Sequence, residues 1–367
     1  MVNSDVNAKL ENLSKNLKMI RKATINLNYA NTGKQQDLLK ISKEYVRVVN
    51  LSIGYLWQKE QFSGSFVKDT SWIDSWLSAR MKQCAAKQAL AIVKSQRKKK
   101  QKTKPVFTRL TMELDSRFIE IKQDVNSFDC WLTLSSIGNK IKLQLPSQKH
   151  KHFNELFQDG WELKKGIRIR VTEKGFFADL YFQKSCQKPK ETGVIKGFDI
   201  GYKKLLVDSN GKRYGSEFEQ LAEKISRKQQ GSKNFLRALT ERNQFINKTV
   251  KDLPFEGIKA IVVENLKSVK HRSKGKIRKK FNNKLQRWTY PLVLERLTNR
   301  CEREGILMTF INPAFTSQVC SCCKVKDKLS RKGEYFKCRS CSFEIDADHN
   351  AARNILHKGL RESIVLV

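Results

Sequence analysis

The sequence predicts an α+β protein of more than one domain, because the spacing of its apolar residues changes repeatedly along 367 residues. Apolar and polar residues alternate over residues 20–28, which is typical of a strand. Apolar residues then recur at helical spacing over 38–56 and 73–84. After Pro105 the period returns to two, and a second mixed region begins near Gly193.

The first half is expected to form an antiparallel sheet or small barrel with a helical insertion. The run RKKKQKTK, from Arg97 to Lys104, is interpreted as a linker or as the end of a basic helix. Arg168 and Arg170 alternate with apolar residues, so they form either an ordinary solvated face or a face that contacts phosphates. The later strands are predicted at 110–114, 141–145, 167–171 and 176–182.

The region after Gly193 combines short strands with helices. GVIKGFDIGYKKLLVDSNGKRYG contains two strand-like runs, and Asn210-Gly211 predicts a hairpin turn before a third short strand. KAIVVENL is apolar on both faces, which indicates a short buried strand, and ILMTFIN is another apolar strand. Between them, Pro291–Glu304 is predicted to be a helix.

The formal net charge of +37, from 73 basic and 36 acidic residues, favours nucleic acid as a partner. Solubility alone needs a net charge of only about 2 to 8 in a small domain. A membrane partner is not expected, because the basic residues are spread along the chain and no apolar run approaches the roughly 20 residues of a membrane helix. The N-terminus also lacks the apolar core of a signal peptide, so we expect a cytoplasmic protein associated with the nucleoid.

Five of the nine cysteines lie between Cys320 and Cys341, which indicates a metal site in a reducing compartment. Cys320 and Cys323 form one C-x-x-C pair and Cys338 and Cys341 form another, the spacing of a tetrahedral zinc ribbon. A redox dithiol and chance clustering are the alternatives. Cys322 does not fit the register. Four protein ligands leave no open position, so one structural Zn2+ is predicted.

Three acids stand in apolar settings: Asp199 in IKGFDIG, Glu264 at the end of AIVVENL, and Asp348 in DADHNAARNIL. Each has an ordinary interpretation on its own. Asp199 could pair with an arginine, Glu264 could be a surface residue at a strand end, and Asp348 could cap a helix. Together they follow the pattern by which two-metal nucleases gather carboxylates on rigid supports, and two Mg2+ ions are therefore predicted.

The motifs of the second region resemble those of the TnpB proteins of bacterial insertion sequences, whose catalytic plan compact type V CRISPR effectors share. The resemblance covers roughly residues 193–360 and implies a split RuvC nuclease of the RNase H-like fold, with the zinc ribbon between the second and third acids. It implies that Asp199, Glu264 and Asp348 are the catalytic acids and magnesium ligands, and that Asp346 assists them. The motifs that carry it are GFDIGYKKLLVDSNG, IVVENL, FTSQVCSCC, CRSC and EIDADHNAARNIL.

Residues 1–190 match no motif of the family, but their strand, helix, strand order is similar to its wedge barrel with an inserted recognition domain. The predicted domains are therefore a wedge-like β-barrel at 1–35 and 105–190, a helical recognition insertion at 36–104, a RuvC-like nuclease at 191–312 and 344–367, and a zinc ribbon that binds target nucleic acid at 313–343.

The resemblance implies an RNA-guided DNA endonuclease that cuts double-stranded DNA beside a short flanking motif, with a guide RNA as its partner. A guided repressor that binds without cutting is an alternative, and the three intact acids count against it. A guide-independent RuvC-like nuclease is another, and the large basic N-terminal half counts against it. The basic run from His271 to Lys280 is either a substrate gate or a solvated loop. The sequence leaves the oligomeric state open.

Overall fold

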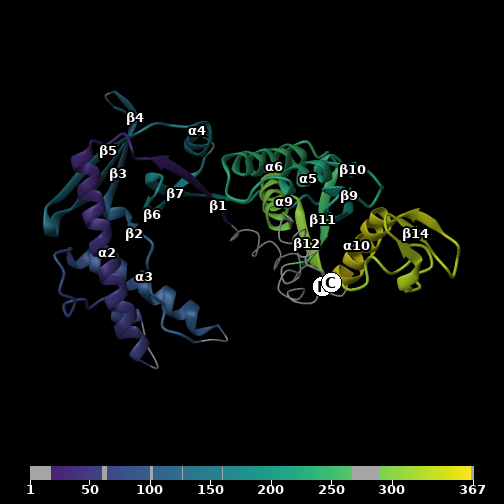
Figure 1. Cartoon of the computed structure of the whole chain (residues 1–367), viewed down its shortest axis with the longest axis horizontal. Helices are drawn as coiled ribbons and strands as arrows, with labels where there is room; N and C mark the ends of the chain where they lie inside the picture. The colour runs from purple at the N-terminus through teal and green to yellow at the C-terminus, as the bar shows by residue number, and fades with distance from the viewer. Residues whose placement is uncertain are drawn as a thin grey trace. The chain divides into compact units, whose positions relative to one another are not determined.

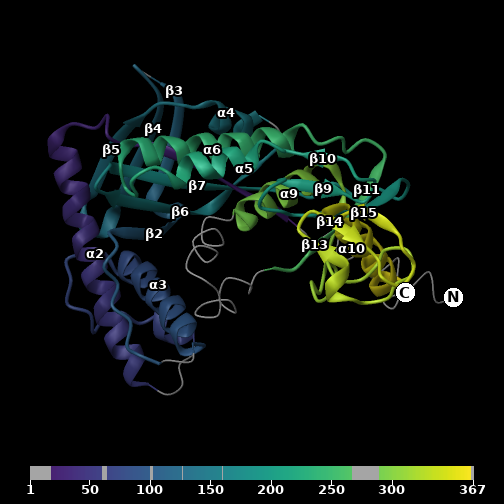
Figure 2. The same ribbon diagram turned by 45° about the vertical axis from the view of Figure 1, so that its right-hand side comes forward.

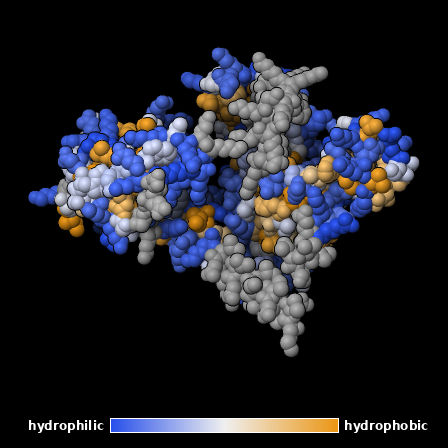
Figure 3. All heavy atoms as spheres, turned by 90° about the horizontal axis from the view of Figure 1, so that it is seen from below, coloured by the Kyte–Doolittle hydropathy of each residue, from blue (hydrophilic) through white to orange (hydrophobic). Residues whose placement is uncertain are grey.

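The computed structural model describes residues 18–59, 64–99, 102–125, 127–158, 160–266 and 289–364. They divide into two compact units, Lys18–Lys184 and a second unit that begins at Ser185 (Figure 1). No helix among these residues has both the length and the apolar character needed to cross a membrane. Hydrophilic residues dominate the coloured surface in the view of Figure 3, and the hydrophobic patches there are small and separate.

The first unit contains a four-stranded sheet, a three-stranded sheet and a helical hairpin. The four-stranded sheet has the order β1-β7-β6-β2 and the other has the order β3-β4-β5. Helices α2 and α3, which lie between β1 and β2 in the sequence, pack side by side (Figure 2). The bounds are β1 Lys18–Asn26, α2 Thr32–Gln58, α3 Ala79–Arg97, β2 Thr111–Asp115, β3 Ile119–Val125, β4 Phe128–Ser136, β5 Ile141–Ser147, α4 Lys151–Gln158, β6 Glu162–Thr172 and β7 Gly175–Ser185.

One hydrophobic core joins these elements, with Ile25 of β1, Tyr45 of α2, Leu132 of β4 and Ile169 of β6 all buried in it. The alternating patterns of the sequence therefore correspond to real strands with one buried face. The strands β3 and β4 were not predicted. Closure of the sheets into a barrel stays a prediction.

The second helix begins later than its apolar stripe suggested. Ser78 caps α3 by accepting a hydrogen bond from the backbone N–H of Met81, so the helix starts at Ala79. Ile73 and Leu77 are buried but precede it. The prediction of helix from Ile73 was wrong because irregular backbone can also place apolar side chains four residues apart in a core.

Arg168 and Arg170 are engaged in ion pairs within the first unit. Arg168 donates to Glu113 at 2.6 Å, and Arg170 binds both carboxylate oxygens of Asp179 at 2.8 Å. These contacts engage both guanidinium groups within the sheet, which counts against the interpretation that they contact phosphates.

The second unit is built around a five-stranded sheet with the order β10-β9-β8-β11-β12. Strands β8, β9 and β10 are joined as antiparallel neighbours, whereas β11 runs parallel to both β8 and β12. The predicted turn at Asn210-Gly211 connects β9 to β10. The bounds are β8 Val194–Asp199, β9 Leu206–Asp208, β10 Arg213–Tyr214, α5 Phe218–Ser226, α6 Lys233–Lys251, β11 Ile258–Glu264, α9 Tyr290–Glu304, β12 Leu307–Ile311 and α10 Ala347–Ile364.

Helices cover both faces of this sheet, as Figure 1 shows. On one face α5, α6 and α9 enclose a core that includes Phe198 and Val263. On the other face Ile355 of α10 packs on Val262 and Ile311. This two-sided burial explains why β11 is apolar on both faces, whereas the edge strand β12 leaves Leu307 and Phe310 exposed.

Gly197 lets α10 approach the sheet closely. A Cβ atom on Gly197 would lie 2.4 Å from the carbonyl oxygen of Ala352 and 2.6 Å from the backbone nitrogen of Leu356. Both atoms belong to the backbone of α10, so a larger residue would push the helix away.

A small three-stranded antiparallel sheet follows β12 and leads directly into α10. Its order is β13-β14-β15, with the bounds Arg331–Lys332, Tyr335–Lys337 and Glu344–Asp346. The first predicted cysteine pair precedes this sheet in the sequence, and the second lies between β14 and β15.

Candidate functional site

Asp199 and Glu264 lie at the carboxyl ends of neighbouring parallel strands. Phe198 of β8 stands opposite Val263 of β11, so Asp199 and Glu264 each come one residue later. Successive side chains of a strand alternate between faces. Phe198 and Val263 point into the core under α5, α6 and α9, so both acids belong to the face that α10 covers.

Asp348 reaches the same end of the sheet from the first turn of α10. Asp346 caps this helix, because one of its carboxylate oxygens accepts hydrogen bonds from the backbone N–H groups of Asp348 at 3.1 Å and His349 at 3.0 Å. The capping role considered for Asp348 therefore belongs to Asp346. The Asp348 side chain is left free for other contacts.

The electrostatics show that the three acids share one environment. Burial, together with the charges of Glu264 and Asp348, raises the pKa of Asp199 to about 8. Burial also raises the pKa of Glu264, although a hydrogen bond from Thr316 opposes this rise. Carboxylates crowded in this way are costly to ionise without a cation, and their hard oxygen atoms suit Mg2+.

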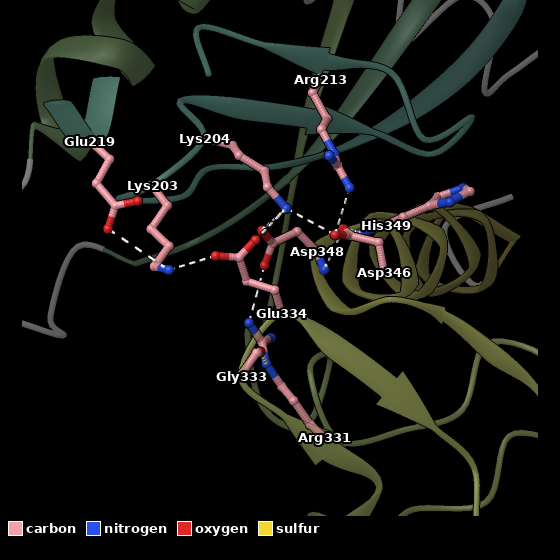
Figure 4. A network of polar contacts seen from close by, with 10 residues as sticks. All are labelled: Lys203, Lys204, Arg213, Glu219, Arg331, Gly333, Glu334, Asp346, Asp348 and His349. Carbon is pink, nitrogen blue, oxygen red and sulfur yellow. Dashed lines mark hydrogen bonds and ion pairs between the residues drawn. The ribbon is translucent and has the colours of Figure 1, made fainter. Parts of the chain in front are cut away.

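Three cationic side chains contact the acids near α10 (Figure 4). The Lys204 ammonium lies 2.9 Å from Asp346 and 3.4 Å from Asp348. Arg331 of the small sheet donates to the other oxygen of Asp348 at 3.1 Å, and Arg213 contacts Asp346 at 2.9 Å. No sequence motif drew attention to these cations, because ion pairs between distant segments leave no local pattern.

The four predicted cysteines come together. The ligand sulfurs of Cys320, Cys323, Cys338 and Cys341 all lie within 4.8 Å of one another. The Cys320–Cys341 and Cys323–Cys338 sulfur distances are 3.8 and 3.6 Å. A tetrahedral site with Zn–S bonds of about 2.3 Å needs sulfurs about 3.8 Å apart, so this donor set fits Zn2+. Among the described residues, Asp199, Glu264 and Asp348 do not form so tight a group.

The two cysteine pairs have matching backbone geometry. The N–H of Lys324 donates to the carbonyl of Cys320, and the N–H of Ser342 donates to the carbonyl of Cys338, both at 3.0 Å. Lys324 and Ser342 both adopt left-handed backbone angles, with φ of 65° and 59°. Each pair is thus a tight knuckle that turns both sulfurs inward. Cys322 is exposed and lies outside the group, as expected.

The thiols differ in how readily they ionise. Burial alone would raise the pKa of Cys338, but the backbone N–H groups of Cys341 and Ser340 help to lower it to about 7. Burial raises the pKa of Cys320 to about 12. A bound cation would favour the thiolate form of all four.

The first knuckle is fastened to α10 by two buried asparagines. Asn350 accepts from the backbone N–H of Ser321 at 2.8 Å and donates to the carbonyl of Val319 at 2.8 Å. Asn354, one helical turn later, donates to the carbonyl of Thr316 at 3.0 Å. The signal for these residues was their four-residue spacing in HNAARN, which places both on one face of the helix.

The basic run from His271 to Lys280 lies outside the described residues.

Comparison with known proteins agrees with this geometry. A family model described as "Cas12f1-like, TNB domain" matches residues 290–355, from α9 into α10. The CRISPR-associated endodeoxyribonuclease Cas12f1 of Sulfoacidibacillus thermotolerans is 44% identical over 85 residues, which make up 22% of this chain and 20% of that protein. The TnpB-like protein aq_aa05 of Aquifex aeolicus is 25% identical over 249 residues, covering 56% of this chain and 81% of the relative. These matches to TnpB-like proteins and to Cas12f1 support a TnpB-family protein.

In fold, the chain is similar to the protein in the structure titled "Cryo-EM structure of the Cas12f1-sgRNA-target DNA complex". The TM-score is 0.55 at 17% identity, with 88% of this chain and 81% of that chain covered. The matched segments span 20%, 37% and 62% of the lengths of three curated relatives. The activity of this chain is therefore a proposal.

Proposed function

We propose that the chain is an RNA-guided DNA endonuclease that hydrolyses phosphodiester bonds in a Mg2+-dependent site of the RuvC type. The convergence of Asp199, Glu264 and Asp348 at one end of the five-stranded sheet carries this proposal. These acids come from two strand ends and a helix start, which are rigid supports of the kind that metal-dependent hydrolysis requires.

The order β10-β9-β8-β11-β12, with α10 packed across the acid-bearing face, supports assignment of the nuclease to the RNase H-like fold. We assign residues 191–312 and 344–367 to it and 313–343 to the zinc ribbon. We assign 1–35 and 105–190 to the wedge-like barrel, which the sheets of the first unit would form, and 36–104 to the recognition insertion, which contains the helical hairpin; residues 1–17 lie outside the described residues.

The protein's own residues would hold and orient the reacting groups. Two Mg2+ ions, when bound, would activate a water molecule and stabilise the leaving oxygen. Asp199 and Glu264 would supply ligands from adjacent strand ends, and Thr316 would orient Glu264 through its hydrogen bond. Asp348 would supply a further ligand from the first turn of α10.

The zinc ribbon would act structurally. Four thiolates complete the coordination of Zn2+ and leave no position for substrate. Asn350 and Asn354 connect the first knuckle to α10, so the ribbon would fix the helix that carries Asp348.

Guide RNA and double-stranded DNA are the proposed partners. The net charge of +37 suits a polyanion, and a relative that is 44% identical over 85 residues is named an endodeoxyribonuclease. In such a complex base pairing reads the target sequence, while the protein reads a short flanking motif.

The direct test starts with expression of the full chain from its gene together with the DNA that flanks this gene, followed by purification of the protein. We expect one defined RNA to copurify. With a matched target and a randomised flank, Mg2+ should support cutting beside one short motif. A complex that binds the matched target but never cuts it would indicate the guided repressor. Cutting without the RNA would indicate the guide-independent nuclease.

A further inference from the structure

The strongest unassigned feature is the Lys204 ammonium, which is surrounded by carboxylates at the proposed metal site. Lys204 lies between β8 and β9, five residues after Asp199, and only 8% of it is exposed. Its ammonium is 2.9 Å from Asp346, 3.3 Å from Glu334 and 3.4 Å from Asp348. Figure 4 shows these carboxylates converging on one nitrogen.

The contacts of Asp348 conflict with metal binding. One of its carboxylate oxygens, Oδ2, faces Lys204, and the other, Oδ1, accepts a hydrogen bond from Arg331 at 3.1 Å. A carboxylate that ligates a metal must turn an oxygen lone pair toward the ion. A divalent ion at Asp348 would lie close to these two positive charges, and their repulsion disfavours its binding until one of the cations withdraws.

Lys204 is the better candidate to withdraw. Its contact with Asp348 is an ion pair at 3.4 Å, longer than the hydrogen bond from Arg331. The Lys204 ammonium stands at the end of a flexible four-carbon side chain and can change position. The planar guanidinium of an arginine presents its donors in a rigid geometry. Arg213 also contacts Asp346, so that carboxylate keeps a partner when Lys204 leaves.

We infer that Lys204 is a built-in counter-cation that competes with a divalent metal ion for Asp348 and so sets the metal concentration that the site needs. This inference rests on the proposed function. Two ligands that compete for one group weaken each other equally, so removing the ammonium must tighten metal binding. Lys204 is thus a positioning residue, since it acts through Asp348.

The neighbouring lysine provides a matched control. Lys203 forms ion pairs with Glu334 and Glu219, and it acts on Asp348 only through its charge. Its ammonium adds charge to the same region without occupying a proposed metal ligand. Loss of Lys203 therefore reports the effect of one less positive charge alone.

The test is a titration of the full, zinc-loaded chain with Mn2+, with free Mn2+ measured by electron paramagnetic resonance. Lys204→Met should bind Mn2+ at least about fivefold more tightly than the parent, the lower end of typical coupling between two ligands. Lys203→Met should differ from the parent by less, and Lys204→Arg should bind like the parent. Unchanged or weaker binding by Lys204→Met would overturn the inference.

Two further measurements keep the result interpretable. Thermal unfolding checks that each variant is folded. If Lys204→Met is not folded, Lys204→Gln takes its place in the titration. Asp199→Ala should lose the Mn2+ site altogether. If Asp199→Ala binds Mn2+ like the parent, the proposed metal site itself fails. If it loses binding while both neutral Lys204 variants remain parent-like, only the counter-cation role fails.

Discussion

The hydroxyl of Thr316 donates a hydrogen bond to carboxylate oxygen Oε1 of Glu264. The backbone carbonyl of Thr316 in turn accepts from Asn354 of α10. The segment that enters the cysteine-bearing ribbon thus touches both the second acid and the helix that presents the third. The ribbon and the acids form one connected arrangement in which the position of each depends on the other.

Replacing Thr316 by valine removes the donor while keeping the side-chain volume. We expect Thr316→Val to cost about 1 kcal/mol in stability and to raise the Mg2+ concentration needed for half-maximal cleavage, because Glu264 loses its fixed orientation. Thr298→Val is the control, since the Thr298 hydroxyl donates to Leu294 within α9 and to the sulfur of Met308, away from the acids. An unchanged Mg2+ dependence would show that Thr316 does not orient Glu264.

Gly197→Ala tests whether α10 must approach β8 closely. The added Cβ would meet the backbone of Ala352 and Leu356, so α10 must shift and carry Asp348 away from Asp199. We expect a loss of about 1–3 kcal/mol in unfolding free energy and a larger fractional loss of cleavage. Gly54→Ala is the matched substitution, because its Cβ finds no atom closer than 3.6 Å and alanine favours the helix. Equal effects of the two changes would contradict the close-approach argument.

Cys338→Ser tests the zinc site. The parent should contain one zinc per chain, and the variant should lose it together with the order of the ribbon, since structural zinc contributes directly to folding. Metal analysis and limited proteolysis between β12 and α10 measure both effects. Cys322→Ser should retain zinc, because Cys322 is exposed and outside the sulfur cluster. Zinc retained by Cys338→Ser at parental stability would exclude the assignment.

The elements that sequence predicted well were those whose signal is local. The alternating strands, the helix of α9 and the two C-x-x-C pairs depend on spacing within a few residues, and the structure contains all of them. The gathering of Asp199, Glu264 and Asp348 is also present, although their catalytic roles stay a prediction.

The missed features depend on contacts between distant segments. Lys204 and Arg331 meet Asp348 only after the chain has folded, and a lone lysine or arginine carries no spacing that marks such a contact. The start of α3 was misplaced because Ile73 and Leu77 continue the helical spacing in irregular backbone. Asp346 took the capping position because two acids in DAD compete for it and only the turn geometry decides.

The pH dependence of the first unit should centre on Asp179. Burial alone would raise the pKa of this carboxyl, but hydrogen bonds from Arg170 and Thr24 outweigh it and hold the pKa below its usual value. Since the folded pKa is lower than the unfolded one, the stabilisation is present above about pH 4 and is lost as the pH falls through the folded pKa.

Urea unfolding of the parent and of Asp179→Asn checks this assignment. At neutral pH the variant should be less stable by about 2–3 kcal/mol, because Arg170 loses its buried partner. The gap should shrink as the pH falls below about 4, where the parent's carboxyl becomes protonated. A difference in unfolding free energy between parent and variant that is the same at neutral and acid pH would contradict the assignment.

The central claim is that Asp199, Glu264 and Asp348 form one hydrolytic site. The most direct measurement compares the parent with the three single alanine variants, each with a matched guide RNA, a target that carries the flanking motif, and Mg2+. The account predicts that each variant still binds guide and target but has lost cleavage, because the ions lose a shared ligand, whereas Asp346→Ala loses less. Cleavage at the parental rate by Asp199→Ala would contradict it.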